Sequence, residues 1–193
     1  MNVKARVIAT AIALVVAGPV IAQDSDGTGK GPEQVSQLNF GPDDALEASF
    51  AAAQPLVTWK YYFVPASAFN RRSSSDQTTY TSGGCIQAKS DYAVSDIQIE
   101  DGASMAVLRV YYKDTDANNT VTAYVTAYDA AGNTSDYGPV TSVAAVGYSS
   151  ATFTFSPYLV TANSARSYVF NVKQAGPSTS TAICGARLFY SIP

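Results

Sequence analysis

Apolar and polar residues alternate along most of the chain from Leu56 to its end. In residues 121–128, for example, valine and alanine alternate with threonine and tyrosine. Alternation with a period of two predicts β-strands, because successive side chains of a strand point to opposite faces. It is clearest in residues 57–63, 108–112, 121–128, 152–155, 168–173 and 184–190, and weaker in residues 79–82, 85–89, 93–100 and 140–147.

Turn-forming residues separate these segments. Residues 114–119 are rich in Asp and Asn and join two long predicted strands, which indicates a hairpin. Many short strands without a convincing helix among them are typical of a β-sandwich or barrel. Bulky residues on one strand face and Thr, Asn or Lys on the other favour two packed sheets. We therefore predict an all-β, antiparallel β-sandwich of jelly-roll type, with an immunoglobulin-like sandwich as the alternative.

The segment 1–22 has the pattern of a secretory signal peptide. Lys4 and Arg6 precede an apolar run, and Gly18-Pro19 ends it, so we expect cleavage before Gln23. No second apolar stretch follows that could span a membrane. The mature protein is therefore expected to be secreted or periplasmic, without a membrane span.

Residues 23–54 are predicted to form a flexible linker and an N-terminal arm, ahead of a β-sandwich domain at 55–193. Pro42 followed by two aspartates is typical of a helix start. Leu46 and Phe50, four residues apart, would share one face of that helix. A short helical or irregular arm lying across its own domain is one interpretation, and docking on a neighbouring subunit is the other.

Composition narrows the function. The 193 residues include 15 acidic and 12 basic side chains and no histidine. A net charge of −3 argues against nucleic acid as a partner. The lack of histidine excludes a Ser-His-Asp triad and histidine-ligated zinc. Glu100 and Asp101 are adjacent, so in a strand they would point apart rather than pair across a cleft. We therefore do not expect an enzyme.

The two cysteines, Cys85 and Cys184, are expected to form a disulfide, because exported chains usually pair their cysteines. A calcium candidate is formed by Asp114, Asp116 and Asn118, which match the opening spacing of a calcium loop. Asn119 and Val125 depart from the rest of that motif. A hairpin tip needs no metal, so the expectation is no cofactor, with calcium as the alternative.

Two features suggest binding. Tyr124 and Tyr128 fall on the threonine-rich face of their predicted strand, where rings could stack on sugars or simply cover the sheet. Arg71 and Arg72 form a local positive charge that could seat an acidic group, or lie in a solvated loop.

Two resemblances follow from longer motifs. Residues 125–135 resemble the late hairpin of bacterial immunoglobulin-like surface repeats. A wider set resembles a group of uncharacterised secreted bacterial proteins, which implies export and a single jelly-roll-type sandwich but no activity. This set comprises residues 64–69, 84–85, 101–103, 108–114, 118–119 and 184–190.

The sequence thus predicts a secreted, non-catalytic structural or interaction module that could also self-assemble as a homo-oligomer. The alternative is a carbohydrate-binding module using exposed tyrosines, and a histidine-free hydrolase is less favoured. The expected partner is a protein or a cell-surface glycan.

Overall fold

The computed structural model describes residues 43–192 except 55, 75–77, 82, 89–91, 145–146 and 177–178. The predicted signal peptide and most of the predicted linker therefore lie outside the described residues. None of the helices in the described part has the length and hydropathy that a membrane-spanning helix requires.

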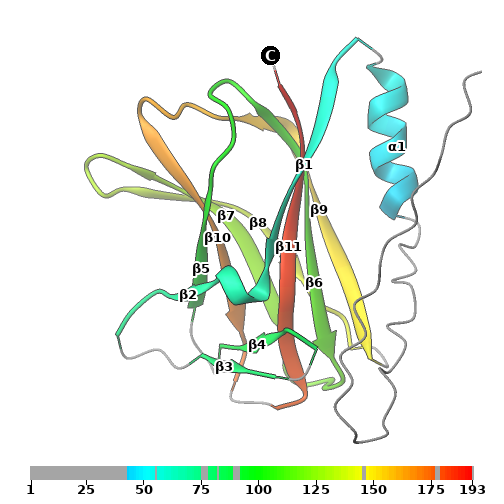
Figure 1. Ribbon diagram of the computed structural model, residues 1–193, viewed down its shortest axis with the longest axis vertical. Coiled ribbons are helices and arrows are strands. Elements are labelled where there is room, and N and C mark those ends of the chain that lie inside the picture. Colours follow the sequence, from blue (N-terminus) through cyan, green and yellow to red (C-terminus); the bar gives the residue numbers. More distant parts are fainter. Residues whose placement is uncertain are drawn as a thin grey trace, which may run out of the picture. The chain divides into compact units, whose positions relative to one another are not determined.

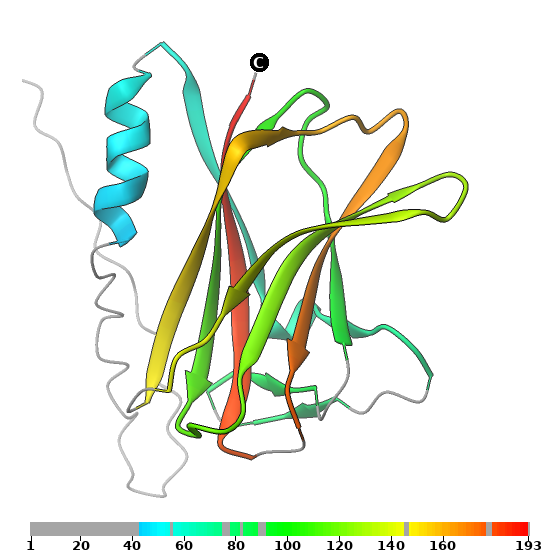
Figure 2. The ribbon, with the colours of Figure 1, turned by 180° about the vertical axis from the view of Figure 1, so that it is seen from behind.

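Two antiparallel sheets pack face to face (Figures 1 and 2). Sheet A contains β1 (Thr58–Pro65), β3 (Thr79–Tyr80), β4 (Ile86–Gln87), β6 (Ser104–Asp114), β9 (Tyr148–Val160) and β11 (Thr181–Ile192). Sheet B contains β2 (Asn70–Arg71), β5 (Tyr92–Ile97), β7 (Val121–Asp129), β8 (Thr134–Thr141) and β10 (Arg166–Gln174). A single turn of 3-10 helix, η1 (Ala66–Ala68), follows β1.

The pairing of the eight longer strands defines the topology. β1 pairs with β11, β5 with β10, β6 with β9 and β7 with β8, so the first strand pairs with the last and each later pair nests inside the previous one. Two further pairs, β6 with β11 and β7 with β10, join these eight strands into the two sheets. Nested pairing of this kind is a jelly roll. The predicted β-sandwich is confirmed, and the immunoglobulin-like alternative is wrong.

Two local predictions were wrong. Residues 114–119 do not close a hairpin, because β6 lies in sheet A and β7 in sheet B, so this turn crosses between the sheets. The predicted strand at 140–147 lies earlier, at Thr134–Thr141. The segment contains Pro139, and β8 is the edge strand of sheet B, where a proline can be accommodated.

The core lies between the sheets. Valine and alanine side chains of β7 at positions 121, 123, 125 and 127 are buried, while the intervening residues face outward. Leu108 of β6, Phe170 of β10 and Leu188 of β11 belong to the same core cluster. In these strands, the alternation of apolar and polar residues corresponds to side chains that face the core and side chains that face outward.

The predicted N-terminal helix is present as α1 (Asp43–Ala53). Leu46 and Phe50 pack on the outer face of sheet A against Val107 and Phe189. The Phe50 ring also lies 6.2 Å from Trp59, measured between ring centroids. Figure 1 shows the helix beside β1 and β9, so this segment packs on its own chain.

The predicted disulfide is confirmed, since Cys85 and Cys184 are bonded. Cys85 immediately precedes β4, and Cys184 lies within β11. The bond stands beside the pairing of Ile86 with Ile183 and fastens the short β4 to the last strand.

Candidate functional site

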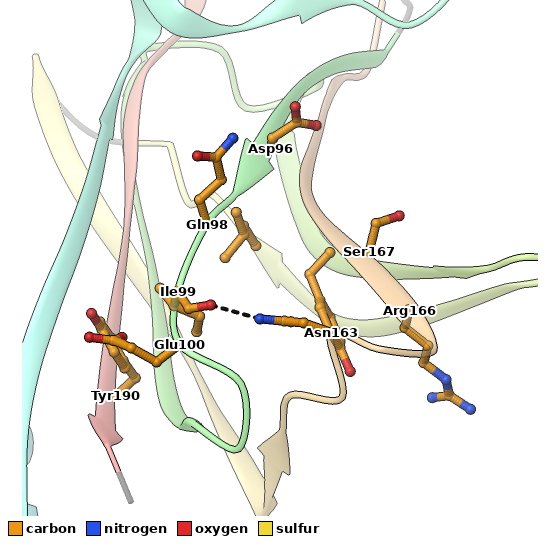
Figure 3. Close-up of a pocket in the computed structure, with 10 residues that line it drawn as sticks. Asp96, Gln98, Ile99, Glu100, Asn163, Arg166, Ser167 and Tyr190 are labelled. Carbon is orange, nitrogen blue, oxygen red and sulfur yellow. Dashed lines mark hydrogen bonds between the residues drawn. The ribbon is translucent and has the colours of Figure 1, made fainter.

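A pocket of about 660 Å³ lies at the end of the sandwich where the loop after β5 meets the loop before β10 (Figure 3). We call it the loop pocket. Its size is within the range usual for small-molecule sites. It is lined by Asp96, Ile97, Gln98, Ile99, Glu100, Asn163, Arg166, Ser167, Tyr168 and Tyr190.

Hydrogen bonds between the two loops fix the walls of the loop pocket. The Asn163 backbone N–H donates to Asp101 Oδ1 at 2.6 Å, and its side-chain Nδ2 donates to the Ile99 carbonyl at 2.8 Å. Thr161 Oγ1 donates to the Glu100 carbonyl at 2.8 Å. Asn163 is therefore a structural link between the loops.

Glu100 of the loop pocket does not have the environment of a general acid. Glu100 accepts a hydrogen bond from Lys60 Nζ at 2.6 Å, and this bond, the largest cause, lowers the pKa of Glu100. A glycosidase needs a carboxyl group with a raised pKa as its general acid. The rings of Tyr168 and Tyr190 are almost fully buried, so this pocket offers no open ring on which a sugar could stack.

A second candidate site lies on the outer face of sheet B. As the sequence predicted, Tyr124 and Tyr128 point outward from β7, and both are partly exposed. The strand register places Tyr92 on β5 at the same face, beside Lys173 of β10. We call the surface of Tyr92, Tyr124 and Tyr128 the tyrosine face.

Tyr92 was missed by sequence reasoning because the weak strand was expected to begin one residue later. The signal was present: Tyr92, Val94 and Asp96 alternate with the buried Ala93 and Ile97. The position of Tyr92 beside Lys173 could not be predicted, because it depends on the pairing of β5 with β10.

Buried polar groups lie on the tyrosine face between Tyr124 and Tyr128. Thr126 Oγ1 donates to Asp136 Oδ1 at 2.6 Å and accepts from Asn171 Nδ2 at 3.3 Å. Within the described part of the chain, the Asn171 amide oxygen accepts no hydrogen bond. Buried polar groups are normally hydrogen-bonded, so this acceptor is an exception within the tyrosine face.

Burial raises the pKa of Tyr124, with smaller contributions from Tyr92 and Asp136. The Tyr124 hydroxyl therefore stays protonated at neutral pH and can donate a hydrogen bond.

The calcium candidates Asp114, Asp116 and Asn118 form a capped turn. Asp114 is buried at the end of β6, accepts from Ser142 Oγ and also accepts from the Asp116 backbone N–H at 3.2 Å. Asp116 in turn accepts from the Asn118 backbone N–H at 2.9 Å and from Asn119 Nδ2 at 2.7 Å. Among the residues that the structure describes, no three His, Cys, Asp or Glu side chains gather to hold a metal. These hydrogen bonds are typical of a turn capped by Asp and Asn side chains.

No protein-family model matches this sequence, and no curated protein matches it. Among solved structures, a carbohydrate-binding module of Cellvibrio mixtus lichenase 5A, in complex with cellotriose, is 16% identical, with 66% of this chain and 95% of that chain covered and a TM-score of 0.42. The C-terminal CBM6 of LamC from Zobellia galactanivorans is 13% identical, with 67% and 98% covered and a TM-score of 0.45. The CBM35 of Abf62 from Cellvibrio japonicus is 12% identical, with 67% and 92% covered and a TM-score of 0.43. None of these likenesses bears on the ligand of this chain, which has to be inferred from its own residues.

Proposed function

We propose that the protein is an exported, non-catalytic module that binds a carbohydrate chain on the tyrosine face. The observation that carries this proposal is the placement of Tyr124 and Tyr128, two partly exposed rings on the same outer face of β7. Four residues of strand separate them by about 13 Å. That spacing suits an oligosaccharide better than a single sugar ring.

The chemistry of this face fits a sugar. A tyrosine ring offers a flat apolar surface at low entropic cost, together with a hydroxyl that can form hydrogen bonds. Between the rings, the exposed carboxylate of Asp136 is a hydrogen-bond acceptor, and Thr126 donates to it at 2.6 Å. Sugars combine apolar C–H faces with hydroxyl groups, so both parts of the surface would be used.

Export and lack of catalysis are supported by separate observations. The Cys85–Cys184 disulfide is of the kind that persists in oxidising compartments. In the loop pocket, the low pKa of Glu100 opposes a role as general acid.

A glycan array probed with the purified mature protein tests the proposal, followed by calorimetry on the glycans that bind. The double variant Tyr124→Ala/Tyr128→Ala is expected to lose binding, and Tyr61→Ala, on the outer face of sheet A, is the matched control that keeps it. Absence of binding to any glycan, or full binding by the double variant, would contradict the proposal.

A second candidate function is protein contact, favoured by Tyr61 and Phe63 on β1. Their exposed fractions are 57% and 54%, which is high for adjacent outward positions of one strand. Exposed aromatic residues of this kind are enriched at protein interfaces. Light scattering coupled to size-exclusion chromatography would reveal self-assembly, and Tyr61→Ser/Phe63→Ser should then abolish it.

A further inference from the structure

Two cations are held over one ring at the edge of the tyrosine face. Arg72 Cζ lies 5.0 Å and Lys173 Nζ lies 5.1 Å from the centroid of the Tyr92 ring. The Arg72 backbone N–H donates to the Tyr92 carbonyl at 3.2 Å, and Lys173 is the strand partner of Tyr92 on β10. Both side chains are therefore anchored to Tyr92 through the backbone as well as through the ring.

This arrangement places two positive charges side by side. The ring attracts each cation, but the two cations repel one another. Among the described residues, no carboxylate forms an ion pair with either Arg72 or Lys173. Asp96 follows Tyr92 by four positions along β5, about 13 Å away. The exposed carboxylate of Asp136 lies farther along the same face, beside Thr126. Among the described residues, the Tyr92 end is therefore the more basic end of the tyrosine face.

Building on the proposed function, we propose that the tyrosine face takes an acidic glycan, with the carboxylate of a uronic acid unit seated at Arg72 and Lys173. A guanidinium matches a planar carboxylate with two parallel hydrogen bonds, and an ammonium adds a point charge beside it. The neighbouring sugar units would then lie over the ring of Tyr124. Tyr92 positions the two cations.

The test uses oligomers of galacturonate, of mannuronate and of hyaluronan, each compared with its fully methyl-esterified form. Methyl esterification removes the negative charge but keeps the sugar shape. At least one acid form is expected to bind more tightly than its ester, and added salt should weaken that preference. The variant Arg72→Gln/Lys173→Gln should bind the acid about ten-fold more weakly, the effect of losing two exposed charge contacts, and should bind the ester as the parent does.

Arg166→Gln is the matched control, since Arg166 begins the same strand as Lys173 but lies at its other end. Equal binding of acid and ester, or an unchanged double variant, would overturn the inference. If neutral glycans bind and lose affinity only in Tyr124→Ala/Tyr128→Ala, the proposed function stands and the acidic ligand falls. If no glycan binds, the proposed function and the acidic ligand are both wrong. Tighter binding of a sulfated oligosaccharide than of the uronate oligomers would overturn the assignment to a carboxylate.

Discussion

Glu47 of α1 and Arg187 of β11 are 140 positions apart, and Arg187 Nη2 lies 2.9 and 2.8 Å from the two Glu47 carboxylate oxygens. Arg109 Nη2 of β6 lies 3.3 Å from the same carboxylate. Glu47 and Arg109 are 3% and 1% exposed, so this cluster is sealed between the helix and the outer face of sheet A. The helix is therefore fixed by charge as well as by Leu46 and Phe50.

Replacing Glu47 with alanine should destabilise the fold strongly. The substitution leaves two guanidinium groups in a buried position without their carboxylate, and breaking a buried ion pair in this way costs about 3 to 5 kcal/mol. Urea unfolding of Glu47→Ala beside the parent measures the loss. Ala48→Ser, on the exposed side of the same helix, is the control and should change stability little. A loss below about 1 kcal/mol for Glu47→Ala would show that the ion cluster does not hold the helix.

The surroundings of Glu47 were only partly predictable from the sequence. The pattern at Leu46 and Phe50 was enough to predict a short helix with one apolar face. Glu47 was not recognised as buried, because a carboxylate in a helix is normally solvated. Its burial depends on Arg109 and Arg187, which only strand pairing brings together.

In the rest of the fold and in the candidate site, too, local features were predictable and features set by strand pairing were not. Alternation predicted β7 and placed Tyr124 and Tyr128 on its outer face, since burial of one face is encoded locally. Whether residues 114–119 closed a hairpin or crossed between sheets could not be predicted, because the same Asp and Asn residues serve both turns. The contact of Arg72 and Lys173 with Tyr92 also depends on register, which no local pattern specifies.

Removal of the disulfide is expected to lower the free energy of unfolding. The bond joins residues separated by 99 positions, and a loop of that length corresponds to about 4 to 5 kcal/mol in the chain-entropy account. Urea unfolding of Cys85→Ala/Cys184→Ala, compared with the oxidised parent, measures the difference. The parent unfolded in the presence of reductant should behave like the variant, whereas identical midpoints with and without the bond would contradict the prediction.

Gly185 of β11 should not tolerate a side chain. Its φ is +156°, and a Cβ there would lie 2.9 Å from the Val64 carbonyl oxygen and 3.0 Å from Phe63 Cζ. The backbone oxygen cannot move away, because β1 and β11 are paired at this point. Strain and crowding together should cost about 3 kcal/mol in Gly185→Ala. In the comparison variant Gly132→Ala, a Cβ would meet nothing within 4 Å. The loss of stability should then be about 1 kcal/mol and come from the left-handed backbone alone. Equal losses in the two variants, measured by urea unfolding, would show that the contact with β1 is unimportant.

The ion pair between Lys60 and Glu100 predicts a pH dependence at the loop pocket. The hydrogen bond between them lowers the pKa of Glu100 from its ordinary value of 4.5 and raises the pKa of Lys60 from 10.5. Because the folded pKa of Glu100 is the lower one, its stabilising effect is present above pH 4.5 and is lost as the pH falls through the folded pKa. Lys60 acts in the opposite direction: its effect is present below pH 10.5 and is lost as the pH rises through its folded pKa.

Lys60→Met removes the donor while keeping the apolar stem, so the pKa of Glu100 should return toward 4.5. An NMR titration of the Glu100 carboxyl carbon measures this directly. Lys113→Met, on another strand, is the control and should leave the titration unchanged. The urea midpoints of parent and Lys60→Met should also converge once the pH is low enough to protonate Glu100 in both. If Glu100 titrates identically in the parent and in Lys60→Met, the pair does not set its charge, and the case against Glu100 as a general acid is lost.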